Sequence, residues 1–231
     1  MTELILAASF MFATHLGISG SALRAWLIGR IGERPYLILY STVALGAIIW
    51  LISAYGRAPY VELWPMTAWS ALVPLLAMPF ILLMAVCGVS TLNPTAVGAP
   101  DSLDQEEPVR GMLRVTRHPF MWAVVLWAAA HLFPNGDLAS LILFGSLGAL
   151  ALLGTRMIDR KFATRRGEAW ARFAAASSNL PFAAILSGRQ RLVLSEIGWS
   201  RIAIALIVYL ALLAAHPWLF GVSPLAPLAA A

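Results

Sequence analysis

Residues 117–131 read Arg-His-Pro-Phe-Met-Trp-Ala-Val-Val-Leu-Trp-Ala-Ala-Ala-His. Proline is favoured at the first position of a helix, where its missing N–H is not needed. The residues between Pro119 and His131 carry no charge, so the stretch predicts a helix that leaves a basic membrane surface and enters the hydrocarbon. His131 closes the run at a depth where a titratable ring is unfavourable, which indicates a ligand, a partner or a metal.

The composition extends this interpretation to the whole chain. Of 231 residues, 60% are hydrophobic and 12% are charged, whereas soluble domains carry about 25% charged residues. The chain is therefore predicted to be all-α, a polytopic membrane helical bundle that forms a single domain over residues 1–231. Its one cysteine excludes an internal disulfide and a cysteine-based metal cluster.

Apolar stretches long enough for spans recur along the chain and predict about six transmembrane helices. A turn sequence at 134–137 joins the fourth and fifth stretches as a hairpin. Apolar and cationic residues alternate near 156–190, which predicts an amphipathic segment lying at the membrane interface. The six predicted spans are Leu4–Ile28, Leu37–Ala54, Trp69–Leu92, Pro119–Phe133, Leu138–Leu153 and Arg201–Phe220.

Nearly all of the basic residues fall on one side of these spans. Of the 16 Lys and Arg residues, only Arg57 lies in a connection on the other side. The positive-inside rule makes the basic side cytoplasmic, so both termini are expected on the periplasmic side of a bacterial inner membrane. The net charge of +5 then belongs to the surface of the lipid bilayer, and no nucleic-acid partner is expected.

Three histidines are expected inside the bilayer, each on a different helix. Counted from the basic end of each helix at about 1.5 Å per residue, their depths are roughly 14 Å for His15, 20 Å for His131 and 22 Å for His216. Histidines on facing helices suit bis-histidine ligation of haem b, and depth alone favours His131 with His216. The alternative is that each ring only hydrogen-bonds a neighbouring helix.

A second candidate site lies at the basic end of the fourth span. His118 is about 20 Å from His131 along one helix, so the two cannot share an iron. Arg114, Arg117 and His118 predict either an anchor that seats the helix at the cytoplasmic surface or a site for an anion at a helix N-terminus.

The chain resembles the NnrU family of integral membrane proteins over about His15 to Pro224. The resemblance implies a link to nitrite and nitric oxide reduction. It also implies kinship with 15-cis-zeta-carotene isomerase, a haem b enzyme that isomerises a polyene double bond, and we expect such an activity to be gated by redox change at the iron. By that resemblance the haem ligands are His15 and His131. The residues that carry the resemblance are 117–122, His131, 135–137, 143–145, Asp159, Ser178, 181–182, 188–189, His216 and 220–221.

A fainter resemblance supplies a competing hypothesis. Arg-His-Pro, a short hairpin, an acidic segment at 101–107 and an aromatic-rich stretch ending in Pro-Phe are similar to isoprenylcysteine and phospholipid methyltransferases. Those enzymes bind S-adenosylmethionine at the cytoplasmic face and usually carry a pair of glutamates, where this chain has Asp159-Arg160. A third hypothesis is a non-enzymatic accessory protein for a respiratory complex. A hydrophobic small molecule is the partner expected under the isomerase hypothesis.

Overall fold

The computed structural model describes residues 1–18, 21–95, 103 and 107–229, and within these ranges it is helical with no β-strand. In the acidic segment at 101–107, Asp101, Asp104 and Glu106 lie outside the described ranges. The elements in chain order are α1 (Thr2–Phe12), the π-helix η1 (Ala13–Ile18), α2 (Ala22–Ile31), α3 (Glu33–Gly56), α4 (Ala68–Ser90), the 3₁₀ turn η3 (Gly111–Arg114), α5 (Pro119–Leu132), α6 (Leu138–Ala176), α7 (Ala183–Leu186), the 3₁₀ turn η4 (Leu194–Glu196), α8 (Trp199–Phe220) and α9 (Ala226–Ala229).

The expected membrane bundle is confirmed. Within the described residues, four helices are long and apolar enough to cross a bilayer, namely α3, α4, α6 and α8, and α5 is a shorter apolar helix. The first predicted span supplies the sixth element as a bent pair, α1 with η1 followed by α2. Many large apolar side chains of these helices are exposed, as the lipid-facing surface of a bundle requires.

The first span differs from the straight helix predicted over Leu4–Ile28. Its two halves make an angle of 75°. The first half ends in a π-helix, and the hydroxyl of Ser21 accepts a hydrogen bond from the Leu23 N–H, which starts α2 as a separate helix. A serine cap competes with continuation of the preceding helix, and the sequence pattern of apolar residues does not reveal this competition.

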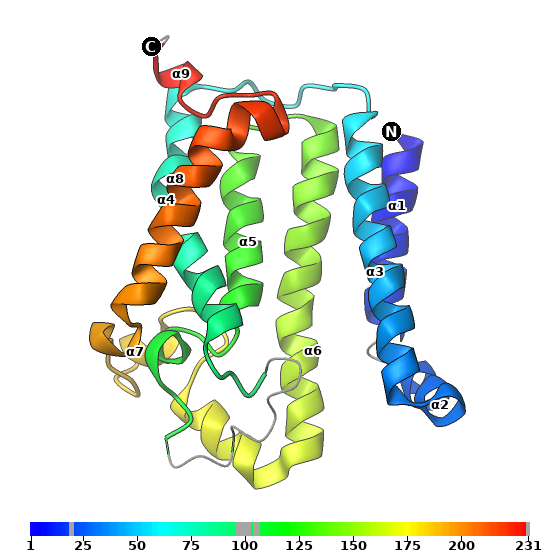
Figure 1. The fold of residues 1–231 in the computed structure, drawn as a ribbon, viewed down its shortest axis with the longest axis vertical. Helices are drawn as coiled ribbons and strands as arrows, with labels where there is room; N and C mark the ends of the chain where they lie inside the picture. The colour runs from blue at the N-terminus through cyan, green and yellow to red at the C-terminus, as the bar shows by residue number, and fades with distance from the viewer. Residues whose placement is uncertain (19–20, 96–102, 104–106, 230–231) are drawn as a thin grey trace.

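The fifth span is longer than Leu138–Leu153. Helix α6 continues to Ala176 and is interrupted only at Gly167, whose φ of +45° is outside the helical region. The expected interfacial segment therefore begins as a direct extension of a spanning helix. Beyond Gly167 the chain turns and lies across the end of the bundle (Figure 1). Glycine permits this turn because it has no Cβ.

The helices form two groups that α6 joins. Helices α1 and α3 pack together on one side, α4, α5 and α8 lie on the other, and α6 contacts both α1 and α5 (Figure 1). The hairpin turn between α5 and α6 is tied to the α3–α4 connection, because the Leu63 N–H donates to the Gly136 carbonyl and the Leu138 N–H to the Val61 carbonyl. A Cβ at Gly136 would overlap the Trp64 carbonyl oxygen, so this turn requires glycine.

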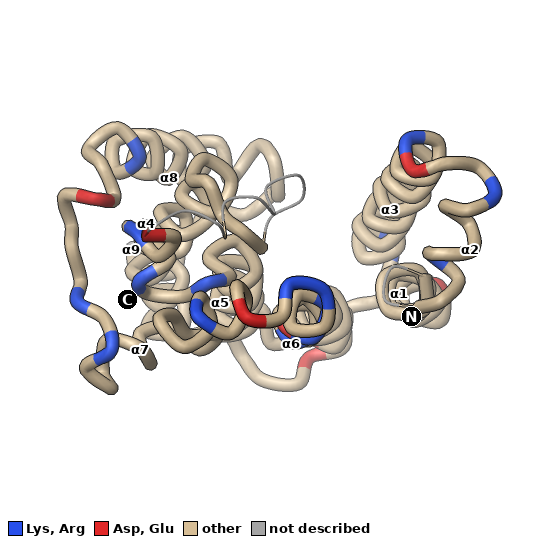
Figure 2. Tube along the Cα trace, turned by 90° about the horizontal axis from the view of Figure 1, so that it is seen from below, with Lys and Arg blue, Asp and Glu red and all other residues tan. Residues whose placement is uncertain are grey.

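Both chain termini lie at one end of the bundle (Figure 1). Seen from the opposite end, lysines and arginines line the connections and the lower part of α6 (Figure 2). We call these the terminal end and the basic end. Arg57 is at the terminal end, where it pairs with Glu3. The charge separation expected from the sequence is therefore present in the fold.

Candidate functional site

A buried polar cluster at the basic end joins α5 to α6. The carboxylate of Asp159 on α6 accepts four hydrogen bonds. Oδ1 accepts from His118 Nε2 at 2.7 Å and from Arg117 Nε at 2.9 Å. Oδ2 accepts from Arg117 Nη2 at 2.6 Å and from Asn179 Nδ2 at 2.9 Å. The forked geometry of Arg117 on one carboxylate is the strong, directional form of an ion pair.

His118 is the most buried member of the cluster. It is 2% exposed, and its backbone N–H donates to the Thr116 hydroxyl. With Nε2 occupied by Asp159, Nδ1 is left without a hydrogen-bond partner among the described residues. Pro119 then takes the first helical position, as the sequence predicts.

The Arg117 backbone is held as firmly as its side chain. Its carbonyl accepts from Asn93 Nδ2 at 3.3 Å and from the Thr95 hydroxyl at 3.0 Å. Its N–H donates to the Ser178 carbonyl, and its guanidinium lies over the Trp170 ring at 5.6 Å. These contacts tie the connections on either side of α5 and the end of α6 to one residue.

Arg114 forms a second ion pair nearby. Its Nε and Nη2 donate to the two carboxylate oxygens of Glu196 at 2.7 and 2.8 Å, and its Nη1 donates to Gln190. The hydrogen bond from Arg114 lowers the pKa of Glu196 below its ordinary value. Each of the two arginines predicted to contact an anion thus already faces a carboxylate. This geometry favours the anchor over the anion site.

A cavity of about 570 Å³ lies next to the cluster. The imidazole of His118 forms part of its wall, together with Phe120 and Met121 of α5 and Ile158 of α6. The rest of the wall is the end of α4 and the following residues, 88–93 and Thr95.

The histidines predicted inside the membrane lie at different ends. Helix α1 descends from the terminal end while α5 and α8 ascend to it (Figure 1). His15 belongs to η1, near the basic end of the first helix, whereas His131 is next to the last residue of α5 and His216 is near the end of α8. The structure therefore brings His131 and His216 to the same end and does not bring His15 to it. The bend after Ile18 explains the difference, because the predicted depth of His15 was counted from Arg24 on a straight helix.

All three rings use Nδ1 in the same way. It bonds a backbone carbonyl in each case, that of Met11 for His15, Trp127 for His131 and Val222 for His216. This hydrogen bond fixes the tautomer in which Nε2 carries the lone pair, as in most metal-binding histidines. The described residues make no hydrogen bond to Nε2 of His131 or His216. The His131 ring stacks on Phe144 at 5.4 Å.

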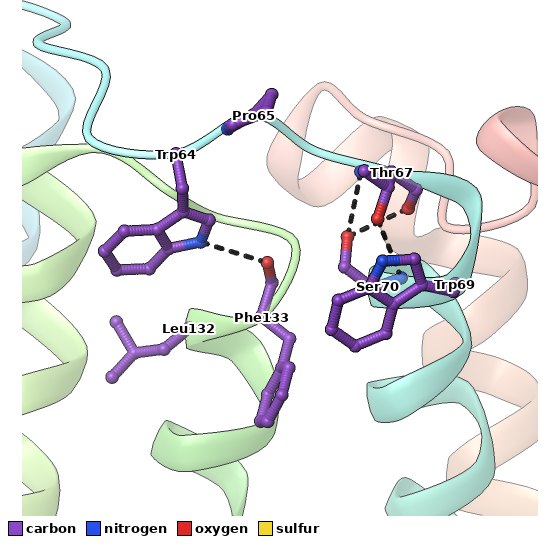
Figure 3. A pocket seen from close by; sticks show the side chains of 7 residues that line it. All are labelled: Trp64, Pro65, Thr67, Trp69, Ser70, Leu132 and Phe133. Atoms are coloured by element: carbon purple, nitrogen blue, oxygen red, sulfur yellow. Dashed lines mark hydrogen bonds between the residues drawn. The ribbon is translucent and has the colours of Figure 1, made fainter.

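An aromatic pocket of about 480 Å³ opens at the terminal end (Figure 3). Trp64 bridges to α5 by donating from Nε1 to the Phe133 carbonyl at 3.2 Å, and Phe133 meets Trp69 edge to face at 6.0 Å. Thr67 and Ser70 hydrogen-bond each other as the capping box of α4, so their polar atoms are already used. The pocket is thus apolar in character, and His131 does not belong to its lining.

Sequence reasoning missed two members of the basic-end cluster. Asp159 was noted as one of the residues that carry the family resemblance and as a departure from a methyltransferase pattern, without a role, and Asn179 was not singled out. The signal for Asp159 was its position, because it is the one acidic residue among the five cations of residues 156–166. Asn179 also accepts a hydrogen bond from Trp122 Nε1 at 3.3 Å. Nothing in its local sequence predicts that it links α5 to the cluster.

Together, the bundle and its sites define a polytopic helical membrane protein with an ion-pair cluster at one end and two of its histidines, His131 and His216, at the other. The NnrU family model, described as NnrU protein, matches residues 3–224. The chain belongs to the NnrU family, as its motifs predict.

Two curated relatives share part of the sequence. The chain is 37% identical over 105 residues to 15-cis-zeta-carotene isomerase, chloroplastic, of Zea mays, and 37% identical over 103 residues to the enzyme of the same name from Arabidopsis thaliana. These matches cover 45% and 44% of this chain but only 28% of each relative. No solved structure matches the chain.

Proposed function

We propose that this chain is a membrane haem protein that isomerises a double bond of a hydrophobic polyene. The observation that carries the proposal is the 37% identity to two 15-cis-zeta-carotene isomerases. Since the matched segment is 28% of each relative, their activity is extended to this chain as a hypothesis. The lipid-facing helices support it, because a substrate dissolved in the bilayer can reach such a protein sideways.

His131 and His216 are the residues we assign to the haem. They lie at the same end of the bundle, and both hold Nδ1 on a backbone carbonyl, which leaves Nε2 with the lone pair that a metal needs. The family resemblance implies the pair His15 and His131 instead; His15 lies in η1 and His131 in the last turn of α5. A b-type haem would supply a redox-active iron able to act on a polyene double bond.

The residues around His131 have two roles in this proposal. Trp127 fixes the ring through its carbonyl, and Phe144 packs against the face of the ring, so the imidazole is held in one orientation. The aromatic pocket at the same end offers an apolar surface on which a polyene chain can lie (Figure 3).

Orientation in the membrane is part of the proposal. We place the basic end in the cytoplasm and both termini in the periplasm of a bacterial inner membrane, on the strength of the charge distribution. A reporter that is active only in the cytoplasm can be fused to either terminus. It should give no signal, and a signal would show that this terminus faces the cytoplasm.

The activity is tested on the protein reconstituted in liposomes with haem supplied. After addition of 15-cis-zeta-carotene, chromatography should show conversion to another geometric isomer. Replacement of His131 by alanine should abolish the conversion, while His15→Ala should retain it. Absence of conversion by the wild-type protein would refute the isomerase proposal. Methyl transfer from S-adenosylmethionine, or co-purification with a reductase without any cofactor, would support the other two hypotheses instead.

A further inference from the structure

The lower part of α6 carries a group of exposed cations that the proposed function does not use. Figure 2 shows lysines and arginines gathered on this part of the helix. The exposed cations between residues 156 and 165 are Arg156, Arg160, Lys161 and Arg165. They lie at the basic end, whereas His131 is at the terminal end (Figure 1), so the group is separate from the proposed haem site.

Two of these cations continue an exposed apolar stripe along the same face of α6. Ala149, Leu153, Arg156 and Arg160 follow one another at intervals of four, three and four residues, which places them on one side of the helix. All four residues are exposed. This face is therefore apolar toward the middle of the helix and cationic toward its basic end, an order that matches the acyl chain and headgroup of a phospholipid.

The depth of the two arginines matches the headgroup layer of a bilayer. Leu138 starts α6, and Arg156 lies about 27 Å further along the axis at about 1.5 Å per residue. The hydrocarbon core of a bilayer is about 30 Å thick, and each headgroup layer adds about 5–8 Å. The hydrocarbon span of α6 therefore ends close to Arg156, and the next turn, which carries Arg160, passes through the layer of lipid phosphates.

The two arginines have no counter-charge within the described part of the chain. The ion pairs that the described residues form involve neither side chain. Asp159, the neighbouring acid on α6, is already engaged in the basic-end cluster. Arg156 and Arg160 stand four residues apart, a spacing at which like charges on a helix repel each other. An anion bound between them would offset this repulsion.

The chemistry of the pair and its depth favour a lipid phosphate as that anion. A guanidinium group presents forked N–H donors that match the oxygens of a phosphate. A soluble polyanion would have to leave water to reach this depth, whereas lipid phosphates already lie there. We propose that Arg156 and Arg160 bind the phosphate of an anionic phospholipid whose acyl chain lies along Leu153. The nearby cations Lys161 and Arg165 favour a lipid with a net negative charge over a zwitterionic one.

Two lipids that share their acyl chains and differ in net charge test this assignment. The full chain, purified in a non-ionic detergent, is titrated with phosphatidylglycerol and with phosphatidylcholine, and native mass spectrometry measures the affinity for the first lipid bound. A cation near a lipid surface contributes about fivefold in affinity, so phosphatidylglycerol should bind at least about fivefold more tightly. Equal affinity for the two lipids would overturn the proposal. Glycerol 1-phosphate at the concentration of the lipid should not displace it, and displacement would show that the site takes a free anion instead.

Paired variants locate the binding. Arg156→Gln combined with Arg160→Gln should weaken phosphatidylglycerol by about 5- to 25-fold and leave phosphatidylcholine unchanged. The matched control, Arg172→Gln combined with Arg191→Gln, removes the same charge from two exposed arginines that follow the turn at Gly167. This control should bind phosphatidylglycerol as the wild type does. An equal loss in both double variants would show that the overall charge attracts the lipid, and the assignment to this face of α6 would be wrong.

Discussion

Replacement of Asp159 by asparagine removes the centre of the basic-end cluster while preserving its shape. Each carboxylate oxygen accepts two hydrogen bonds, one pair from His118 and Arg117 and the other from Arg117 and Asn179. An asparagine amide offers only one oxygen. In either orientation its NH₂ group faces two donors, and Arg117 loses its counter-charge.

The expected loss of stability follows from the burial of these groups. The side chains of Arg117 and Asp159 are 13% and 19% exposed, so screening by water is limited. Removing one partner of a buried pair costs about 3–5 kcal/mol, and the residual exposure places Asp159→Asn near the lower limit, at about 3 kcal/mol. Arg160→Gln, which removes a neighbouring exposed charge, should change stability by less than about 0.5 kcal/mol.

Reversible unfolding in mixed micelles, driven by an anionic denaturing detergent, measures both variants against the wild-type protein. Equal stability of Asp159→Asn and Arg160→Gln would show that the cluster does not hold α5 to α6, and the reasoning from its geometry would fail.

Two further predictions concern other contacts at the same end. Arg114 lowers the pKa of Glu196 below its ordinary value of 4.5, so the pair stabilises the fold fully above that pH and progressively less as the pH falls below it. The stability difference between wild type and Glu196→Gln should therefore shrink in acid, and a difference that grows below pH 4.5 would contradict this assignment. A Cβ at Gly88 would lie 2.6 Å from the Phe120 backbone nitrogen, where α4 and α5 meet. Gly88→Ala should destabilise the bundle by about 1–3 kcal/mol, whereas Gly145→Ala, with nothing within 4 Å, should not, and thermal unfolding of the two variants decides.

The apolar pattern predicted the elements of the fold but not their exact course. Hydrophobic runs report burial in lipid, so they located the spans well. They do not report where a hydroxyl such as that of Ser21 starts a new helix, or that Asp159 anchors an extended α6. Both effects depend on hydrogen bonds, one local and one across 42 residues of chain.

The candidate site was predicted in part for a similar reason. Arg117 and His118 stood out because they precede Pro119 at the mouth of an apolar helix. Their partners Asp159 and Asn179 come from a distant segment, and pairing across such a distance has no local sequence signal. The depth estimate grouped His131 with His216, which the fold keeps at one end. For His15 the estimate assumed one straight helix as far as Arg24, whereas the first half of the bent pair ends at Ile18.

The absorption spectrum of the protein, purified in detergent after expression with haem supplied, tests the central claim most directly. We predict a Soret band and, on reduction, the sharp visible bands of a six-coordinate haem. His131→Ala and His216→Ala should each lose that six-coordinate signature, and His15→Ala should keep it. A wild-type spectrum without a Soret band, or one that His131→Ala leaves unchanged, would contradict the account.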